Sequence, residues 1–173
     1  MIIIKLTGGL GNQMFQYAFA RKLSVLKNVP IKLDIFWYLD SNFGKDTKRE
    51  YALKLFDIQE NIATREDVAP FLAKRSLIHR FIKKFKRDIL NIDDFGFNPK
   101  LLATKNDVYF DDHCQSEKYF IDIADVLRKE FILKDGLSLD AQVIQKQILT
   151  SNSVSLHIRR GDYVSDKNAN TMI

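Results

Sequence analysis

Residues 1–36 read MIIIKLTGGLGNQMFQYAFARKLSVLKNVPIKLDIF, and this stretch has the clearest pattern in the chain. The continuous apolar run over residues 1–6, closed by a Thr-Gly-Gly turn, is typical of a strand buried on both faces. Apolar residues then recur at helical spacing over residues 12–27, and an Asn-Val-Pro sequence ends the predicted helix. The alternating, β-branched residues 31–36 predict a second strand. Because strand, glycine turn, helix and strand form a βαβ unit, we expect an α/β fold with a parallel sheet.

The rest of the chain alternates between periodic segments and polar connections. We expect helices over residues 76–90, 117–131 and 138–149, a helix start at residues 64–67, strands over residues 107–111 and 154–158, a loop over residues 41–50 and a turn at residues 98–99. Ser116 is the candidate N-cap of the helix over residues 117–131.

Length and composition exclude several classes of protein. A chain of 173 residues predicts one domain with part of a second, on a prior of about 150 residues per domain. The single cysteine excludes an intramolecular disulfide, and one cysteine with three scattered histidines predicts no zinc cluster. No apolar run approaches the ~20 residues that span a bilayer. We therefore expect a cytoplasmic protein, either soluble or peripheral on the inner face of the membrane.

The net charge of +5 is concentrated in one segment. Residues 74–90 contain seven Lys or Arg and a single Asp. One interpretation is an amphipathic helix whose cationic face is solvated, and the other is docking on an anionic membrane surface. A nucleic-acid-binding module is the weaker alternative, because the cations form one stripe and no recognition motif accompanies them.

The first candidate site is GGLGNQ over residues 8–13, between the first strand and the first helix. Glycines let a bound group approach the backbone, and free N–H groups at a helix N-terminus attract anions. Asn12 and Gln13 add side-chain donors at the same end. The alternative is an ordinary strand-to-helix turn that Asn12 caps. The dinucleotide-binding fingerprint is not matched, because Met14 occupies the position of its third glycine.

The second candidate site is HIRRGDY over residues 157–163, directly after an expected strand. Ligands in open α/β sheets lie at the carboxyl ends of strands. The guanidinium groups of Arg159 and Arg160 suit a diphosphate, because each grips two oxygens and stays charged. Asp162 either fixes an arginine or accepts from a ribose hydroxyl. The alternative is a strand end with a solvated Arg–Asp ion pair.

Five blocks of the sequence, in order, resemble one known family. The blocks are GGLGNQMFQYAFARKL, KLDIFWY, REYALKLFDI, CQSEKYF and VSLHIRRGDYV. Together they resemble the bacterial α-1,2-fucosyltransferases, glycosyltransferase family 11, whose HxRRGD element is shared with the wider fucosyltransferase superfamily. The resemblance covers essentially the whole chain, and the HIRRGDYV block is its most specific part.

The resemblance implies a Rossmann-like N-terminal domain of a GT-B-type glycosyltransferase, with its second domain truncated. Residues 1–150 would form the acceptor-side α/β domain, and residues 151–173 the first strand and HxRRGDY motif of the GDP-fucose-binding domain. The implied donor-binding residues are His157, Arg159, Gly9, Gly11, Asn12 and Gln13. Trp37 and Tyr38 are weaker candidates for stacking on an acceptor sugar, with core packing as the alternative.

The implied reaction is inverting transfer of fucose from GDP-fucose to the 2-OH of a terminal galactose. The acceptor is a glycan, which in O-antigen synthesis is carried on a lipid. No cofactor and no metal are expected, because the chain lacks Asp-x-Asp and its arginines can neutralise the departing β-phosphate. Arg159, Arg160 and Asp162 are the candidate catalytic residues. A second interpretation is a non-catalytic truncated chain that has lost most of its donor pocket.

Overall fold

The computed structural model describes residues 1–39, 49–72, 88–90, 97–104, 106–111 and 114–158. The chain divides into two compact units, Met1–Asp135 and Gly136–Ile173. The first unit contains a four-stranded sheet with the strand order β2-β1-β4-β3. Its strands are β1 (Ile2–Lys5), β2 (Ile31–Asp34), β3 (Asp88–Leu90) and β4 (Val108–Phe110). All three strand pairs are parallel, so the predicted α/β fold with a Rossmann-like parallel sheet is confirmed.

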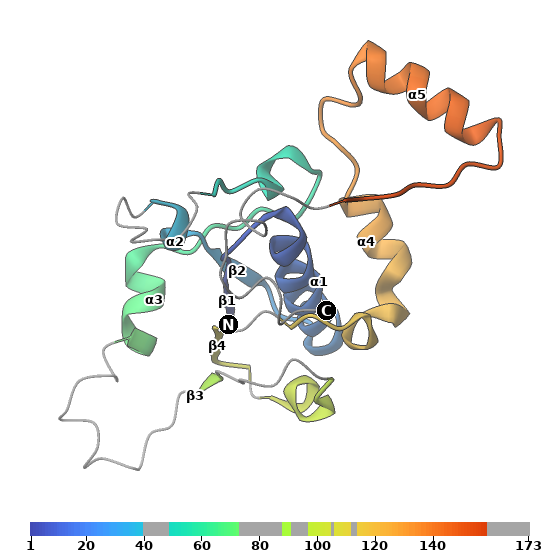
Figure 1. Cartoon of the computed structure of the whole chain (residues 1–173). Coiled ribbons are helices and arrows are strands. Elements are labelled where there is room, and N and C mark those ends of the chain that lie inside the picture. Colours follow the sequence, from blue (N-terminus) through green and yellow to red (C-terminus); the bar gives the residue numbers. More distant parts are fainter. Residues whose placement is uncertain (40–48, 73–87, 91–96, 105, 112–113, 159–173) are drawn as a thin grey trace, which may run out of the picture. The chain divides into compact units, whose positions relative to one another are not determined.

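The sheet is covered on both faces, which explains why β1 is a run of apolar residues without alternation. Ile2 and Ile4 belong to the larger core cluster, together with apolar residues of helix α1 (Leu10–Lys27). Ile3 points to the other face, where it packs with Val68 and Phe71 of helix α3 (Arg65–Leu72). Figure 1 shows α1 and α3 on opposite sides of the sheet. The three isoleucines have no solvent-exposed surface.

Helix α1 forms where the sequence places an apolar face at helical spacing. Tyr17, Phe19 and Leu23 are fully buried. Phe19 meets Phe110 of β4 edge to face, with ring centroids 4.9 Å apart, an arrangement that contributes about 0.5–1.5 kcal/mol beyond area burial. The helix ends as predicted at Asn28, which adopts a left-handed conformation (φ 52°).

Shorter elements complete the chain. They are the helices α2 (Phe36–Leu39), α4 (Ala124–Glu130) and α5 (Leu139–Leu149), and the 3-10 helices η1 (Leu53–Leu55), η4 (Pro99–Ala103), η5 (Glu117–Tyr119) and η6 (Ile121–Ile123). The predicted turn at residues 98–99 is the start of η4, where the Asn98 side chain accepts a hydrogen bond from the Lys100 N–H. The strand predicted over residues 107–111 is confirmed as β4.

Three predicted elements of the first unit differ from the structure. The strand predicted over residues 31–36 ends at Asp34, because the Asp34 carboxylate accepts from the Phe36 N–H and starts α2. Residues 88–90, predicted as the end of a helix, instead pair with β4, since strand pairing outweighs a helical pattern. The remaining residues of that helix lie outside the described residues, as do most of those of the loop predicted over residues 41–50.

The helix predicted over residues 117–131 is regular only in its second half. Two 3-10 turns precede α4, and Ser116 makes no capping hydrogen bond. The ring of Tyr119 explains the interruption, because it is buried against Phe19 at a centroid distance of 5.1 Å while its hydroxyl accepts from the Asn98 N–H. Anchoring Tyr119 in the core therefore overrides the helical period.

In the second unit, α5 is confirmed, and Ser138 caps it by accepting from the Ala141 N–H at 3.3 Å. The strand predicted over residues 154–158 is not formed. Its apolar side chains are almost fully exposed, with Val154 at 95% and Leu156 at 85%, and the described part of the chain offers it no strand partner. The first unit ends at Asp135, so α5 groups with the residues after it, whereas the domain boundary at residue 150 stays a prediction.

Candidate functional site

The candidate site lies at the carboxyl edge of the parallel sheet, where α/β proteins bind ligands. Strands β1 and β4 are neighbours, so the segments that follow them leave the sheet side by side. The segment after β1 contains the glycine turn (residues 8–11) and the start of α1. The segment after β4 contains Asp111 and Gln115. Both predicted and unpredicted polar residues therefore meet at this edge.

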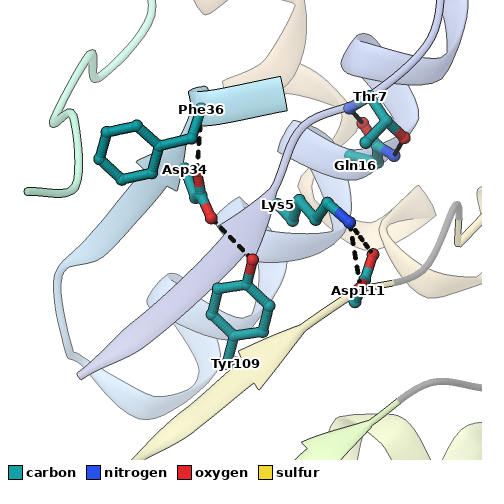
Figure 2. A network of polar contacts seen from close by, with 7 residues as sticks. All are labelled: Lys5, Thr7, Gln16, Asp34, Phe36, Tyr109 and Asp111. Carbon is teal, nitrogen blue, oxygen red and sulfur yellow. Dashed lines mark hydrogen bonds and ion pairs between the residues drawn. The ribbon is translucent and has the colours of Figure 1, made fainter. Parts of the chain in front are cut away.

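Polar side chains tie the ends of β1 and β4 together (Figure 2). The Lys5 ammonium group forms an ion pair with Asp111, at 3.0 Å from Oδ1. Thr7 and Gln16 bond reciprocally: the Thr7 N–H donates to Oε1 of Gln16, and Nε2 of Gln16 donates to the Thr7 hydroxyl. These contacts fix the point at which the backbone leaves the sheet and enters α1.

Asp34 is a buried carboxylate at the carboxyl end of β2, with only 3% of its surface exposed. Its Oδ2 accepts from the Tyr109 hydroxyl at 2.7 Å, and its Oδ1 accepts from the Phe36 N–H at 2.9 Å (Figure 2). A buried carboxylate needs such partners, because leaving it without hydrogen bonds is costly. Asp34 thus anchors the start of α2, the helix that carries Trp37 and Tyr38.

The glycine turn combines one glycine that the backbone requires with two that it does not. Gly8 has a φ of 77°, a conformation that residues with a Cβ rarely adopt. Gly9 and Gly11 have ordinary backbone angles, and a Cβ added to either would meet no atom of the described residues within 4 Å. The described residues therefore leave the space beside these two glycines open, so that a ligand can reach the backbone at the start of α1.

The N-terminus of α1 offers hydrogen-bond donors to this open space. N–H groups in the first turn of a helix have no intrahelical acceptor and carry partial positive charge. Gly9 is the N-cap and contributes no side-chain acceptor. The first turn contains no acidic residue, so nothing within α1 neutralises this positive end. The arrangement favours an anionic or hydroxyl oxygen as the bound group.

Gln13, predicted to contact the donor, is fully buried and already holds the turn. Its Nε2 donates to the carbonyls of Gly8 (3.2 Å) and Glu50 (2.9 Å). Its Oε1 accepts from the N–H groups of Ala52 and Leu53. Because both hydrogens and the oxygen are used, contact with a ligand would require one of these bonds to break.

Trp37 and Tyr38 are neighbours on α2, and both are half-buried. The Tyr38 hydroxyl donates to the Gly8 carbonyl at 3.1 Å. Burial raises the pKa of Tyr38, so the hydroxyl stays protonated and remains a donor. The two rings pack edge to face at 4.9 Å. Tyr38 therefore braces the turn, and the predicted role of both rings in acceptor stacking stays a prediction.

Asn12 does not cap α1 but makes a contact with the segment after β4. Its Oδ1 accepts from Nε2 of Gln115 at 2.8 Å. Its amide group also lies against Gly8, where an added Cβ would come within 2.4 Å of the Asn12 Nδ2. The Asn12 side chain is thus held between Gly8 and Gln115, and its predicted contact with the sugar donor stays a prediction.

The second candidate motif is described only at its first two residues. His157 belongs to the second unit and is exposed. Arg159, Arg160 and Asp162, the predicted catalytic residues, lie outside the described residues, as does Gly161. Their predicted roles stay predictions.

Sequence reasoning missed the polar residues that hold the edge together. Asp34, Asp111 and Lys5 each stand at or next to the carboxyl end of a strand, which is the signal that could have singled them out. No local pattern predicts the role of Gln115, because its hydrogen bond to Asn12 joins residues 103 positions apart in the sequence.

The described residues contain no cluster of three His, Cys, Asp or Glu side chains placed to hold a metal ion. Within those same ranges, no helix has the length and apolar character needed to cross a lipid bilayer.

Comparisons with known proteins identify the family. Residues 1–172 match the model of glycosyl transferase family 11. An α-1,2-colitosyltransferase of Escherichia coli is 33% identical over 173 residues, covering 98% of this chain and 57% of that relative. The O-antigen biosynthesis glycosyltransferase WbnK of Escherichia coli is 32% identical, covering 95% and 60%.

The chain thus spans a little over half the length of these two relatives. No solved structure matches it. Since the family match extends over essentially every residue, the chain belongs to glycosyltransferase family 11.

Proposed function

We propose that the chain is part of an inverting, metal-independent α-1,2-fucosyltransferase that transfers fucose from GDP-fucose to the 2-OH of a terminal galactose. Membership of family 11 supports glycosyl transfer, and the α-1,2 linkage in a relative's name supports attack by a 2-OH. The observation that carries the proposal is the bare backbone at Gly9 and Gly11, at the carboxyl edge of a parallel sheet. Colitose is the second candidate sugar, because one relative is a colitosyltransferase.

In the proposed reaction, the acceptor hydroxyl gives up its proton to a base and its oxygen attacks the anomeric carbon of the fucose, while GDP leaves from the opposite face. Negative charge then develops on the β-phosphate oxygen. Arg159 and Arg160 neutralise it, and Asp162 holds the arginines in direction. Preorganised donors of this kind contribute roughly 2.7–4 kcal/mol each to stabilising a transition state.

Residues of the first unit have proposed contacts of their own with the two substrates. Backbone N–H groups at the start of α1 and the Asn12 amide donate to oxygens of the nucleotide-sugar. Trp37 and Tyr38 border the acceptor sugar, since aromatic faces pack well on the apolar faces of sugar rings. The Asp34 carboxylate keeps α2, and with it both aromatic residues, in place.

The proposed acceptor is a lipid-linked O-antigen glycan, in keeping with the role named for one relative. The basic residues 74–90 would hold the protein on the anionic inner face of the membrane, where each Lys or Arg contributes about 1 kcal/mol. Co-sedimentation with liposomes tests this part. Equal binding to neutral and anionic vesicles would remove it.

The test of the proposed function is a transfer assay with a defined donor and acceptor. The chain, and a longer form carrying the relatives' remaining length, are incubated with GDP-fucose or GDP-colitose and a β-galactoside. We expect release of GDP and a new α-1,2 linkage, identified by NMR of the product. UDP-galactose is the control donor. If neither donor yields GDP or product in the longer form, the proposal is wrong.

Replacing Arg159 tests the assignment of the diphosphate contact. In the form that transfers, Arg159→Ala should lower turnover at least a hundredfold, because removal of one such donor costs about that much. Circular dichroism should show an unchanged fold. Turnover within a few-fold of wild type would contradict the role given to Arg159.

A non-catalytic chain is the second candidate. The exposure of Val154, Leu156 and Ile158 favours it, because the strand that precedes the HxRRGDY motif is not built into a sheet here. Transfer by the longer form together with inactivity of the 173-residue chain would establish this second candidate for the chain itself.

A further inference from the structure

The Asn12 amide is enclosed by two residues that are distant in sequence. Gly8 leaves the space in which the amide lies, since a Cβ at residue 8 would sit 2.4 Å from Nδ2 and 3.2 Å from Cγ. On the other side, the Gln115 Nε2 donates to the Asn12 Oδ1 at 2.8 Å. The side chain of Asn12 is therefore restrained both by packing and by a hydrogen bond.

This hydrogen bond also decides which end of the Asn12 amide is available. A carboxamide has an oxygen that accepts and a nitrogen that donates. Because Gln115 donates to the oxygen, the nitrogen of Asn12 is directed to the glycine turn. Its two hydrogens have no hydrogen-bond acceptor among the described residues. A donor without an acceptor thus lies against Gly8, the residue that begins the glycine turn.

The backbone around Gln115 is shaped to present its side chain. Cys114 has a φ of 49°, which is unfavourable for a residue with a Cβ. The Ser116 N–H donates to the Cys114 carbonyl at 2.8 Å, so Gln115 stands at the centre of a tight three-residue turn. Strained backbone of this kind concentrates at functional sites.

We infer that Gln115 is a positioning residue, which orients Asn12 so that its side-chain NH₂ donates to an oxygen of the sugar donor's diphosphate. This inference rests on the proposed function. Gln115 itself touches no ligand and acts only through Asn12. A free Asn12 would present its oxygen to the ligand for part of the time, and an oxygen repels an anionic group.

The experiment uses the 173-residue chain labelled with ¹⁵N and titrated with GDP, followed by NMR. The side-chain NH₂ resonances of Asn12 should shift on binding. Gln115→Met keeps the length of the side chain but cannot donate, and it should weaken GDP binding about three- to tenfold, the usual effect of one hydrogen bond. Gln59→Met, the same change at another exposed glutamine of the first unit, is the matched control and should leave binding unchanged.

A double-mutant cycle separates a positioning role from a general effect on the fold. Asn12→Ala should weaken binding by a similar factor, and adding Gln115→Met to it should have no further effect. Additive losses, or wild-type affinity in Gln115→Met, would overturn the inference while leaving the proposed function intact. Absence of GDP binding by the wild-type chain would instead overturn the Asn12 contact and the inference with it, and the transfer assay would decide on the proposed function separately.

Discussion

Gly8 and Gly11 occupy the same turn, yet only the first needs to be glycine for the backbone to fold. Gly8 has a left-handed φ of 77° and gives its side-chain space to Asn12. Gly11 lies in the first turn of α1, and a Cβ added there would meet no described atom within 4 Å. At the scale of single residues, neither backbone conformation nor packing among the described residues requires glycine at position 11.

The pair Gly8→Ala and Gly11→Ala tests this distinction. Gly8→Ala should lower the free energy of unfolding by at least about 1–2 kcal/mol, because it forces a Cβ into a left-handed conformation. Gly11→Ala should leave stability unchanged or raise it by up to about 1 kcal/mol, since alanine is the better helix former. Urea unfolding measures both. Equal losses would contradict the assignment.

Gln13 is a residue whose sequence position suggests hydrogen bonding to a ligand, but whose side chain makes its hydrogen bonds to the backbone of the protein itself. Gln13→Leu should destabilise the chain by about 2 kcal/mol or more, because the buried Leu53 N–H and the half-buried Ala52 N–H lose their acceptor. Gln145→Leu, at an exposed position of α5, is the control and should change stability by less than about 0.5 kcal/mol. Similar values for the two would show that the Gln13 network is not formed.

At the scale of elements, α3 depends on a reciprocal cap at its first turn. The Asp67 N–H donates to the Thr64 hydroxyl at 3.2 Å, and the Thr64 N–H donates to Oδ2 of Asp67 at 2.9 Å. The same carboxylate accepts from the Lys32 ammonium group of β2 at 2.6 Å. One aspartate therefore both starts the helix and ties it to the sheet.

This cap predicts an effect of pH. The hydrogen bond from Lys32, followed by that from the Thr64 N–H, lowers the pKa of Asp67. The resulting stabilisation is present above the pKa of the unfolded chain, near about 3.9, and is lost as pH falls through the lower folded value. Thermal unfolding of wild type and Asp67→Asn should differ at pH 7 and converge in acid. A difference that persists in acid would contradict the ion pair.

The same cap can be weakened without changing charge. Thr64→Ala should cost about 1 kcal/mol at pH 7, the usual value for an N-cap. Ser at this position should restore most of it, because the hydroxyl is retained. Urea unfolding of the three forms decides the point, and equal stability of the alanine and threonine forms would exclude a capping role.

At the scale of the whole molecule, the two units differ in how their apolar residues are used. The first unit buries its large apolar side chains around the sheet, whereas α5 has no buried residue and leaves Val143, Ile144 and Ile148 more than half exposed. Core packing therefore stabilises the first unit, and the second unit gains little from it among the described residues.

Matched truncations test this difference. Phe19→Ala should destabilise the chain by about 3–5 kcal/mol, as expected for a buried aromatic residue. Ile148→Ala removes a large apolar side chain from α5 and should change the unfolding of the first unit by less than about 0.5 kcal/mol. Unfolding is followed by tyrosine and tryptophan fluorescence. A large effect of Ile148→Ala would show that α5 packs on the core.

Local patterns predicted the elements that depend on near neighbours. The βαβ unit over residues 1–36, the strand β4 and the helix α5 with its Ser138 cap all follow from periodicity and capping. Failures occurred where distant contacts decide. Tyr119 interrupts a helical pattern because its ring enters the core, and residues 88–90 become a strand because β4 lies beside them.

The sequence by itself determined the α/β class and the position of the glycine turn, because both depend on residues close together in the chain, and it determined the family through the identity and order of its motifs. Only the tertiary structure showed that the Gln13 side chain makes its hydrogen bonds within the protein, that the Asp34 carboxylate accepts from the first residue of α2, and that Gln115 donates to Asn12. Each of these is a hydrogen bond whose partner's position is set by how strands pair and helices pack. The spacing of residues along one sequence does not predict which distant residues form such hydrogen bonds.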